Sequence, residues 1–185
     1  MTTISPARPR CPADLIAAIQ AATSQHADWQ RTADLAAAQL RRYLPSAPEL
    51  LTVAERQGDP AGYQCHVLHS EPDGAFSVTA MVWRPGQVTP IHDHVTWCVF
   101  GVLQGVEYEE LFALASDGSH LLDVGRNESG PGDVSGFAPP GDIHRVRNIG
   151  DSVAVSLHVY GADITRLGSS VRRIYDLPVL RPAPS

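Results

Sequence analysis

Two histidines one residue apart, His92 and His94, are the clearest chemical signal in this 185-residue sequence. In an extended strand alternate side chains share a face, so both imidazoles point to one side and Asp93 points to the other. His144 follows some fifty residues later, and another strand could bring it to the same place. Three imidazoles together would form one face of a metal coordination sphere. Because such ligands are neutral, the metal would keep its full positive charge and could bind an anionic substrate directly.

A second run of chemically useful residues extends from Ser156 to Tyr160. On a strand, Ser156, His158 and Tyr160 share one face, and the apolar residues between them supply the other. A polar face of this kind lines either solvent or a cavity, and the interior of a barrel favours the cavity. A hydroxyl, an imidazole and a phenol in this order could pass hydrogen bonds along the strand and present the phenol to a ligand.

The elements that must position these residues change from helical to β-rich along the chain. Over residues 14–44 apolar side chains recur at helical spacing, with a break near Ala27-Asp28, and Pro45 ends the pattern. After Gly58-Asp59-Pro60, short β-rich runs alternate with turn residues. The predicted strands are Tyr63–His69, Phe76–Arg84, Trp97–Gln104, Glu107–Leu114, His120–Val124, Asp133–Ala138, Ile143–Arg147 and Val153–Tyr160, and Val171–Leu177 fits either a strand or a short helix. Many short strands without βαβ alternation predict an all-β sandwich or small barrel.

Length and composition limit the class of protein. The length suits one domain over residues 1–185, with a helical section over about 12–48 and a β-barrel over about 60–178. A net charge of −6 without a basic stripe argues against nucleic acid as a partner. No apolar run could span a bilayer or serve as a signal peptide, so we expect no membrane partner. Three cysteines, few and odd in number, favour a reducing cytoplasm.

The histidines lie in two stretches that resemble the cupin motifs. Gly86-(x)5-His92-Asp93-His94-(x)3-Cys98-(x)6-Gly105 is similar to the first motif, although cupins usually place a glutamate ligand where this chain has Cys98. Pro139-Pro140-Gly141-(x)2-His144-(x)3-Asn148 is similar to the second motif. The resemblance implies a double-stranded β-helix, or jelly roll, whose mouth holds a metal.

Three imidazoles leave several chemistries open. Zinc on such ligands could activate a water molecule, so a zinc or nickel hydrolase or isomerase is one alternative. A metal-binding protein without catalytic activity is another. A facial set of neutral ligands with open positions also suits Fe(II).

With the Ser156–Tyr160 run included, the chain resembles the cysteine dioxygenase family of thiol dioxygenases, and the similarity covers most of the chain. The resemblance implies that the three histidines bind Fe(II) and that Ser156, His158 and Tyr160 form an outer-sphere triad. It also implies the reaction, in which O2 oxidises a small carboxylated thiol, such as cysteine or 3-mercaptopropionate, to a sulfinic acid. The substrate thiolate would then supply the anionic ligand that the protein lacks.

Within this resemblance Cys98 acquires a second interpretation. Mammalian members carry a cysteine at the corresponding place that forms a thioether with the triad tyrosine, whereas many bacterial relatives carry glycine. A Cys98–Tyr160 crosslink is therefore one reading of this chain. The other is a small thiol packed in the barrel wall.

The residues that would recognise the substrate carboxylate depart from the family pattern. Family members use an arginine or a glutamine two residues after a strand tyrosine. Here, counting forward from Tyr63 gives Cys65, and counting back from the metal ligands gives His66. Arg172 and Arg173 could supply a cation if their segment folds over the barrel mouth, and otherwise they form an ordinary surface pair.

Overall fold

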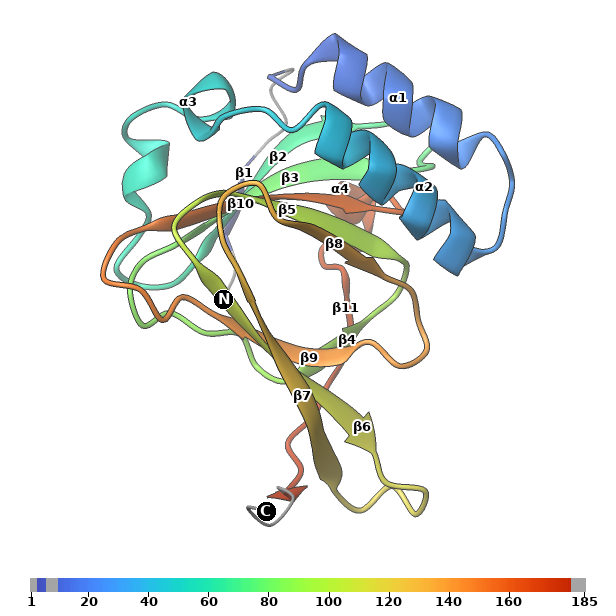
Figure 1. Ribbon diagram of the computed structural model, residues 1–185, viewed down its shortest axis with the longest axis vertical. Coiled ribbons are helices and arrows are strands. Elements are labelled where there is room, and N and C mark those ends of the chain that lie inside the picture. The colour runs from blue at the N-terminus through green and yellow to red at the C-terminus, as the bar shows by residue number, and fades with distance from the viewer. Residues whose placement is uncertain (1–2, 6–9, 181–185) are drawn as a thin grey trace.

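Two six-stranded sheets form the body of the protein in the computed structural model, which describes residues 3–5 and 10–180 (Figure 1). The first sheet has the order β1 (Thr3–Ser5), β2 (Gln64–Ser70), β3 (Ser77–Trp83), β10 (Ala154–Tyr160), β5 (Cys98–Gln104) and β8 (Val134–Phe137). The second has the order β11 (Val171–Ile174), β4 (His92–His94), β9 (Ile143–Arg147), β6 (Glu107–Leu114), β7 (Leu121–Ser129) and β12 (Val179–Leu180).

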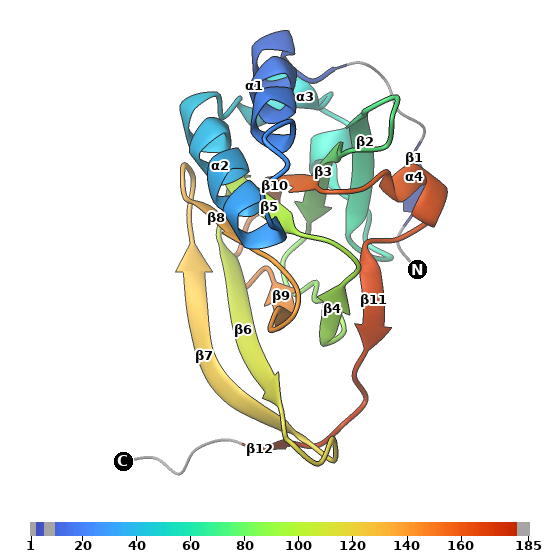
Figure 2. The ribbon, with the colours of Figure 1, turned by 90° about the vertical axis from the view of Figure 1, so that its right-hand side faces the viewer.

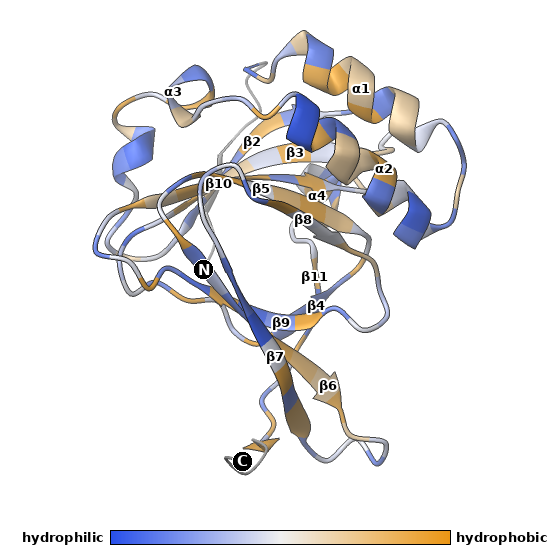
Figure 3. Cartoon of the chain, viewed as in Figure 1, coloured by the Kyte–Doolittle hydropathy of each residue, from blue (hydrophilic) through white to orange (hydrophobic). Residues whose placement is uncertain are grey.

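Two helices, α1 (Ala13–Thr23) and α2 (Trp29–Arg42), cover the outer face of the first sheet (Figure 1). They break where the sequence predicts, because the side chain of Asp28 accepts a hydrogen bond from the backbone N–H of Arg31 and caps α2. The helix α2 has alternating hydrophilic and hydrophobic bands, whereas α1 is largely hydrophobic (Figure 3) and buries Leu15, Ile19 and Ala22. Three shorter elements complete the chain: α3 (Ala47–Leu50), a 3-10 turn (Glu55–Gln57) and α4 (Ile164–Leu167).

Strand β10 has both faces buried, and all seven of its residues are at most 8% exposed. Val155, Leu157 and Val159 pack into the cluster formed with the helices. The alternate residues therefore face the space between the two sheets, where Cys98, Met81 and Val146 also pack. The polar face of Ser156–Tyr160 thus lines an interior space and not solvent, as the alternation predicts.

The ends of the predicted strands lie within one residue of the observed ends, except at two places, and β1 and β12 were not predicted. β7 continues to Ser129, because it pairs with β6 over the whole length of that strand and the pairing satisfies its backbone groups. The predicted segment Val171–Leu177 contains the strand β11 over Val171–Ile174, which pairs with β4 at the edge of the second sheet (Figure 2). Within the described residues, no helix is long and apolar enough to cross a membrane.

Candidate metal centre

The imidazoles of His92, His94 and His144 converge at the centre of the second sheet. His92 and His144 are direct cross-strand partners on β4 and β9, and His94 follows on the same face of β4. One ring nitrogen from each histidine lies within 4.8 Å of the other two, and all three side chains are buried. The structure therefore assembles the ligand set that the sequence predicts.

Each of these imidazoles is held through Nδ1. Nδ1 of His144 donates to the Glu109 carboxylate at 2.6 Å, and Nδ1 of His94 lies 3.0 Å from the Asp142 carboxylate. Nδ1 of His92 lies 3.0 Å from the backbone carbonyl of Pro90. Because all three acceptors take a proton from Nδ1, each Nε2 keeps its lone pair for another ligand.

The free Nε2 atoms fit a bound metal ion. Nε2 of His144 is buried and has no hydrogen-bond partner among the described residues, which is costly unless something else occupies that direction. Burial, reinforced by the neighbouring imidazoles, lowers the pKa of His92 to about 3, and burial also lowers the pKa of His94. The imidazoles of His92 and His94 are therefore neutral near pH 7, the state in which histidine binds a metal.

Two carboxylates lie behind the imidazoles, and the sequence analysis did not identify either of them. Burial is the largest single influence on Glu109 and would raise its pKa, but the hydrogen bonds from His144 and Asn127, with the electrostatic interactions of His144 and His94, together outweigh it and the pKa is lowered. The same balance lowers the pKa of Asp142, which accepts both the ring N–H and the backbone N–H of His94. Two negatively charged groups therefore lie behind the ligand rings, each within hydrogen-bond distance of an Nδ1 atom. Nothing in their spacing signals this, because the partners are 35 and 48 residues apart in the chain.

Beside the histidines, the Ser156–His158–Tyr160 face forms a hydrogen-bonded row. The Ser156 hydroxyl lies 2.9 Å from Nε2 of His158, and the Tyr160 hydroxyl lies 3.3 Å from Nδ1 of the same ring. Burial, with the nearby metal-site imidazoles, lowers the pKa of His158 to about 3, so the ring is neutral. The phenol end of the row lies next to the metal centre, since the rings of Tyr160 and His94 are 6.3 Å apart.

Cys98 occupies the position directly opposite Tyr160 on the neighbouring antiparallel strand. Its Sγ lies 3.8 Å from Nδ1 of His158, and the side chain is fully buried. Burial raises the pKa of both the Cys98 thiol and the Tyr160 phenol well above their ordinary values. Both groups are therefore protonated near neutral pH and in position to contact each other.

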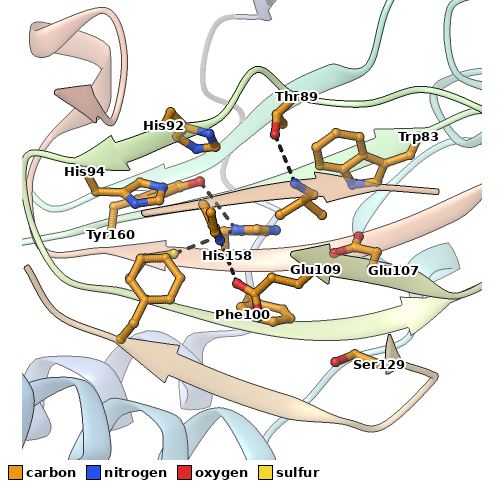
Figure 4. Close-up of a pocket in the computed structure, with 14 residues that line it drawn as sticks. Trp83, Thr89, His92, His94, Phe100, Glu107, Glu109, Ser129, His158 and Tyr160 are labelled. Atoms are coloured by element: carbon orange, nitrogen blue, oxygen red, sulfur yellow. Dashed lines mark hydrogen bonds and ion pairs between the residues drawn. The ribbon is translucent and has the colours of Figure 1, made fainter. Parts of the chain in front are cut away.

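These groups line a central cavity of about 40 Å³, which Figure 4 shows with its lining residues. Its wall is mainly apolar, with Trp83, Phe100 and Phe137 around the histidines. A larger hollow of about 550 Å³ lies outside it and reaches His92, with Tyr63, Val171 and Ile174 on its wall. A small molecule can therefore approach the histidines from the outer hollow.

A family comparison agrees with this geometry. The model of the family described as cysteine dioxygenase type I matches residues 1–167. The chain belongs to this family. The match includes the three histidines, Cys98 and the Ser156–Tyr160 row.

Several solved structures of cupin proteins are similar to part of this member of the cysteine dioxygenase family. The cupin domain of an XRE family transcriptional regulator from Enterobacter cloacae has 16% identity and a TM-score of 0.41, with 54% of this chain and 95% of that chain covered. A cupin 2 conserved barrel domain protein from Salinispora arenicola has 24% identity and a TM-score of 0.42, with coverages of 60% and 83%. Recombinant oxalate oxidase in complex with glycolate has 19% identity and a TM-score of 0.47, with coverages of 64% and 59%. The fold is a cupin β-barrel core with N-terminal helices.

The two positions after Tyr63 that could replace the family's carboxylate-binding residue face opposite ways. Cys65 points between the sheets, into the cluster that contains Cys98 and Tyr160. His66 points away from this cluster, and its Nδ1 lies 4.0 Å from the Glu55 carboxylate. Neither side chain lines the central cavity or the outer hollow in the described part of the chain.

Arg172 and Arg173 lie on β11, at the edge of the second sheet. The Arg172 guanidinium forms an ion pair with Asp93, which is buried and also accepts a hydrogen bond of 2.7 Å from the Tyr175 hydroxyl. The Arg173 guanidinium lies over the Tyr175 ring at 4.4 Å. Among the residues that the structure describes, no arginine lines either the central cavity or the outer hollow.

Proposed function

We propose that this protein is an Fe(II)-dependent thiol dioxygenase that oxidises a small carboxylated thiol to a sulfinic acid with O2. The observation that carries the proposal is the convergence of three imidazole rings, each held through Nδ1, beside a buried Ser–His–Tyr row. Membership of the cysteine dioxygenase type I family supports the same reaction class. Cysteine and 3-mercaptopropionate are the proposed substrates.

The residues of this chain would orient the metal ligands, provide nearby negative charge and exclude water from the reaction site. Fe(II) bound by His92, His94 and His144 would supply open coordination positions for the thiolate and the redox chemistry with O2. Glu109 and Asp142 fix the orientation of two of the ligand rings and raise their basicity. The apolar wall of the central cavity excludes bulk water, so a bound thiolate meets only oriented groups.

The row on β10 would hold the proton next to the substrate. The Tyr160 hydroxyl is at the end of the row nearest the metal centre, and His158 orients it at 3.3 Å. Ser156 in turn holds the other nitrogen of the His158 ring. We propose that the Tyr160 hydroxyl contacts the bound substrate and exchanges a proton with it.

For the substrate carboxylate we propose binding in the outer hollow. Tyr63 lies on its wall and stacks on Trp83, with ring centroids 4.4 Å apart, so its position is fixed from within the barrel. Cys65, His66, Arg172 and Arg173, the residues that the sequence suggests for this role, do not line this hollow, and the last three have other partners. Three unpaired cysteines also support a reducing location, and we propose the cytoplasm.

Anaerobic loading with Fe(II), followed by O2-uptake measurements with cysteine and 3-mercaptopropionate, tests the proposal. We expect thiol-dependent uptake of one O2 for each sulfinate formed. A zinc-loaded sample and the His144→Ala variant are the matched controls, and both should be inactive. Uptake that does not depend on a thiol, or activity with zinc alone, would contradict the proposal and favour the hydrolase or isomerase alternative.

A further inference from the structure

Glu107, the first residue of β6, is a buried carboxyl group at the end of the central cavity away from the histidines. Its side chain lines the cavity with Trp83 and Ser129, and Figure 4 shows these residues on the side opposite His92 and His94. The residue is 3% exposed. Within the described chain, Oε1 of Glu107 and Nε1 of Trp83 are both buried without a hydrogen-bond partner at ordinary distance. A buried polar atom of this kind calls for a functional or structural explanation.

The carboxyl group continues the row on β10. The Ser156 hydroxyl is near enough to the Glu107 carboxyl to lower its pKa, although no hydrogen bond of ordinary length joins them, and the same hydroxyl lies 2.9 Å from Nε2 of His158. The other nitrogen of that ring faces the Tyr160 hydroxyl. Four groups thus connect the metal centre to the far end of the cavity, in the order Tyr160, His158, Ser156 and Glu107.

The charge on Glu107 determines the direction of every hydrogen bond in this row. When Glu107 is ionised, Ser156 donates to its carboxylate, Nε2–H of His158 donates to Ser156, and the Tyr160 hydroxyl donates to Nδ1. When Glu107 is protonated, it donates to Ser156, Ser156 donates to Nε2, and Nδ1–H donates to Tyr160. In the second arrangement the Tyr160 proton is free to face the metal centre. The two arrangements differ in the tautomer of His158.

Glu107 is also the group in the row whose charge can change near neutral pH. Burial raises its pKa to about 7, although the dipoles of Ser156 and Trp83 oppose the rise and the charge on Glu109 adds to it. The other titratable groups that face it keep one state: the pKa of His158 is about 3, that of Glu109 is lowered, and that of Cys98 is raised well above its ordinary value. The remaining neighbours, Ser129, Ser156 and Trp83, carry no charge.

We propose that Glu107 is the proton acceptor at the far end of the Tyr160–His158–Ser156 row and sets the tautomer of His158. The proton source rests on the proposed function, since a thiol that binds as a thiolate must lose a proton. The thiol proton passes to the Tyr160 oxygen, the Tyr160 proton to Nδ1 of His158, the Nε2 proton to Ser156, and the Ser156 proton to Glu107. One S–H bond is broken and one carboxyl O–H bond is formed, with no change of oxidation state.

Two spectroscopic measurements test this without depending on activity. Infrared spectra of the zinc-loaded protein, recorded across the pH range, should show a carboxylic acid C=O band that disappears as the pH rises through about 7. This band should be absent from Glu107→Gln. In the same zinc-loaded protein, 15N chemical shifts should show that the proton on the His158 ring moves from Nδ1 to Nε2 as the pH rises, with the same midpoint as the loss of the C=O band. In Glu107→Gln these shifts should not change with pH.

Glu110→Gln is the matched control, because Glu110 is on the same strand but on its opposite face, where it forms ion pairs with the partly exposed Arg145 and Arg147. This variant should keep both titrations. A C=O band that persists in Glu107→Gln, or a His158 tautomer that is constant with pH in the wild-type protein, would overturn the proposal.

Addition of 3-mercaptopropionate to the anaerobic Fe(II)-loaded protein at pH 8 tests the proton source. We expect the C=O band to reappear in the wild-type protein, and kcat/KM to fall about tenfold per pH unit below pH 7 in the wild type but not in Glu107→Gln. If the thiol does not bind at all, the proposed function is wrong, but the pH titrations of Glu107 and His158, which are measured without thiol, are unaffected. If the thiol binds and no band appears, the role of Glu107 as acceptor is wrong.

Discussion

The carboxylate of Glu109 accepts a hydrogen bond of 2.6 Å from Nδ1 of His144. Glu109 is itself held in place, because Nδ2 of Asn127 donates to its other oxygen at 3.0 Å. This pair fixes the tautomer and orientation of the one ligand that reaches the metal centre from β9. The metal site is therefore built by three strands, β4, β9 and β6, of which the last contributes no ligand.

We expect Glu109→Gln to weaken metal binding about 10–100-fold, the usual effect of losing a carboxylate behind a histidine ligand. The reason is that the amide no longer raises the basicity of the His144 ring. Competition between the protein and a chromophoric chelator measures the affinity. Glu110→Gln on the same strand is the control and should bind the metal as the wild type does. Equal affinities in all three proteins would show that Glu109 has no part in the site.

Arg172→Ala should destabilise the protein and have a small effect on the Michaelis constant for a thiol. The ion pair with Arg172 compensates the buried charge of Asp93, and its loss should cost about 1 kcal/mol because the arginine itself is half-exposed. Arg173→Ala is the control, since its guanidinium lies on the outer side of Tyr175. Thermal unfolding and steady-state kinetics on both variants separate the effects. A raised Michaelis constant with an unchanged melting temperature would instead support carboxylate recognition by Arg172.

The opposite positions of Cys98 and Tyr160 predict a thioether in the protein after turnover with O2 as the oxidant. Formation of the C–S bond removes two hydrogens from the pair. Mass spectrometry of peptides should locate this loss on the two strands that carry these residues, and Cys98→Ser should abolish it. An active enzyme with the full mass of both peptides would show that Cys98 is only a packed thiol.

Gly161→Ala should cost about 1–3 kcal/mol of stability, the range seen when a packed site is overfilled. A Cβ atom at Gly161 would lie 2.1 Å from Nε1 of Trp97, so the indole or the strand end would have to move. Because Gly161 follows Tyr160 directly, activity should fall as well. Gly62→Ala is the control, since a Cβ there meets nothing within 4 Å. Chemical denaturation of both variants measures the difference.

The raised pKa of Glu107 predicts that its contribution to stability decreases as the pH rises. Its folded pKa of about 7 lies above the ordinary 4.5, so between these values the folded state holds a proton that the unfolded state has released. The contribution is complete below pH 4.5 and is lost as the pH rises through about 7. At about 1.4 kcal/mol per pH unit, the loss is about 3 kcal/mol. The free energies of unfolding of the wild type and of Glu107→Gln should be measured from pH 4 to 8. The wild-type value minus the variant value should decrease by about 3 kcal/mol over this range, and a constant difference would contradict the prediction.

The sequence alone determined the parts of the site that depend on local geometry. Because side chains alternate along a strand, the shared face of His92 and His94 and that of Ser156, His158 and Tyr160 follow from spacing alone. The alternation along β10 left either solvent or a cavity for its polar face, and the expected barrel favoured the cavity. The ends of α2 follow from a cap at Asp28 and from the prolines after it.

The tertiary structure alone decided which distant residues meet these faces. Glu109, Asp142 and Glu107 acquire their partners from the pairing of β6 with β9 and from the closure of the two sheets. Arg172 meets Asp93 because β11 pairs with β4, and the inward position of Cys65 depends on the register of β2 with β3. The physical reason is that a shift of one residue in register turns every side chain of a strand to the opposite face. Spacing along the chain therefore predicts the faces, and only the pairing of strands decides what each face contacts.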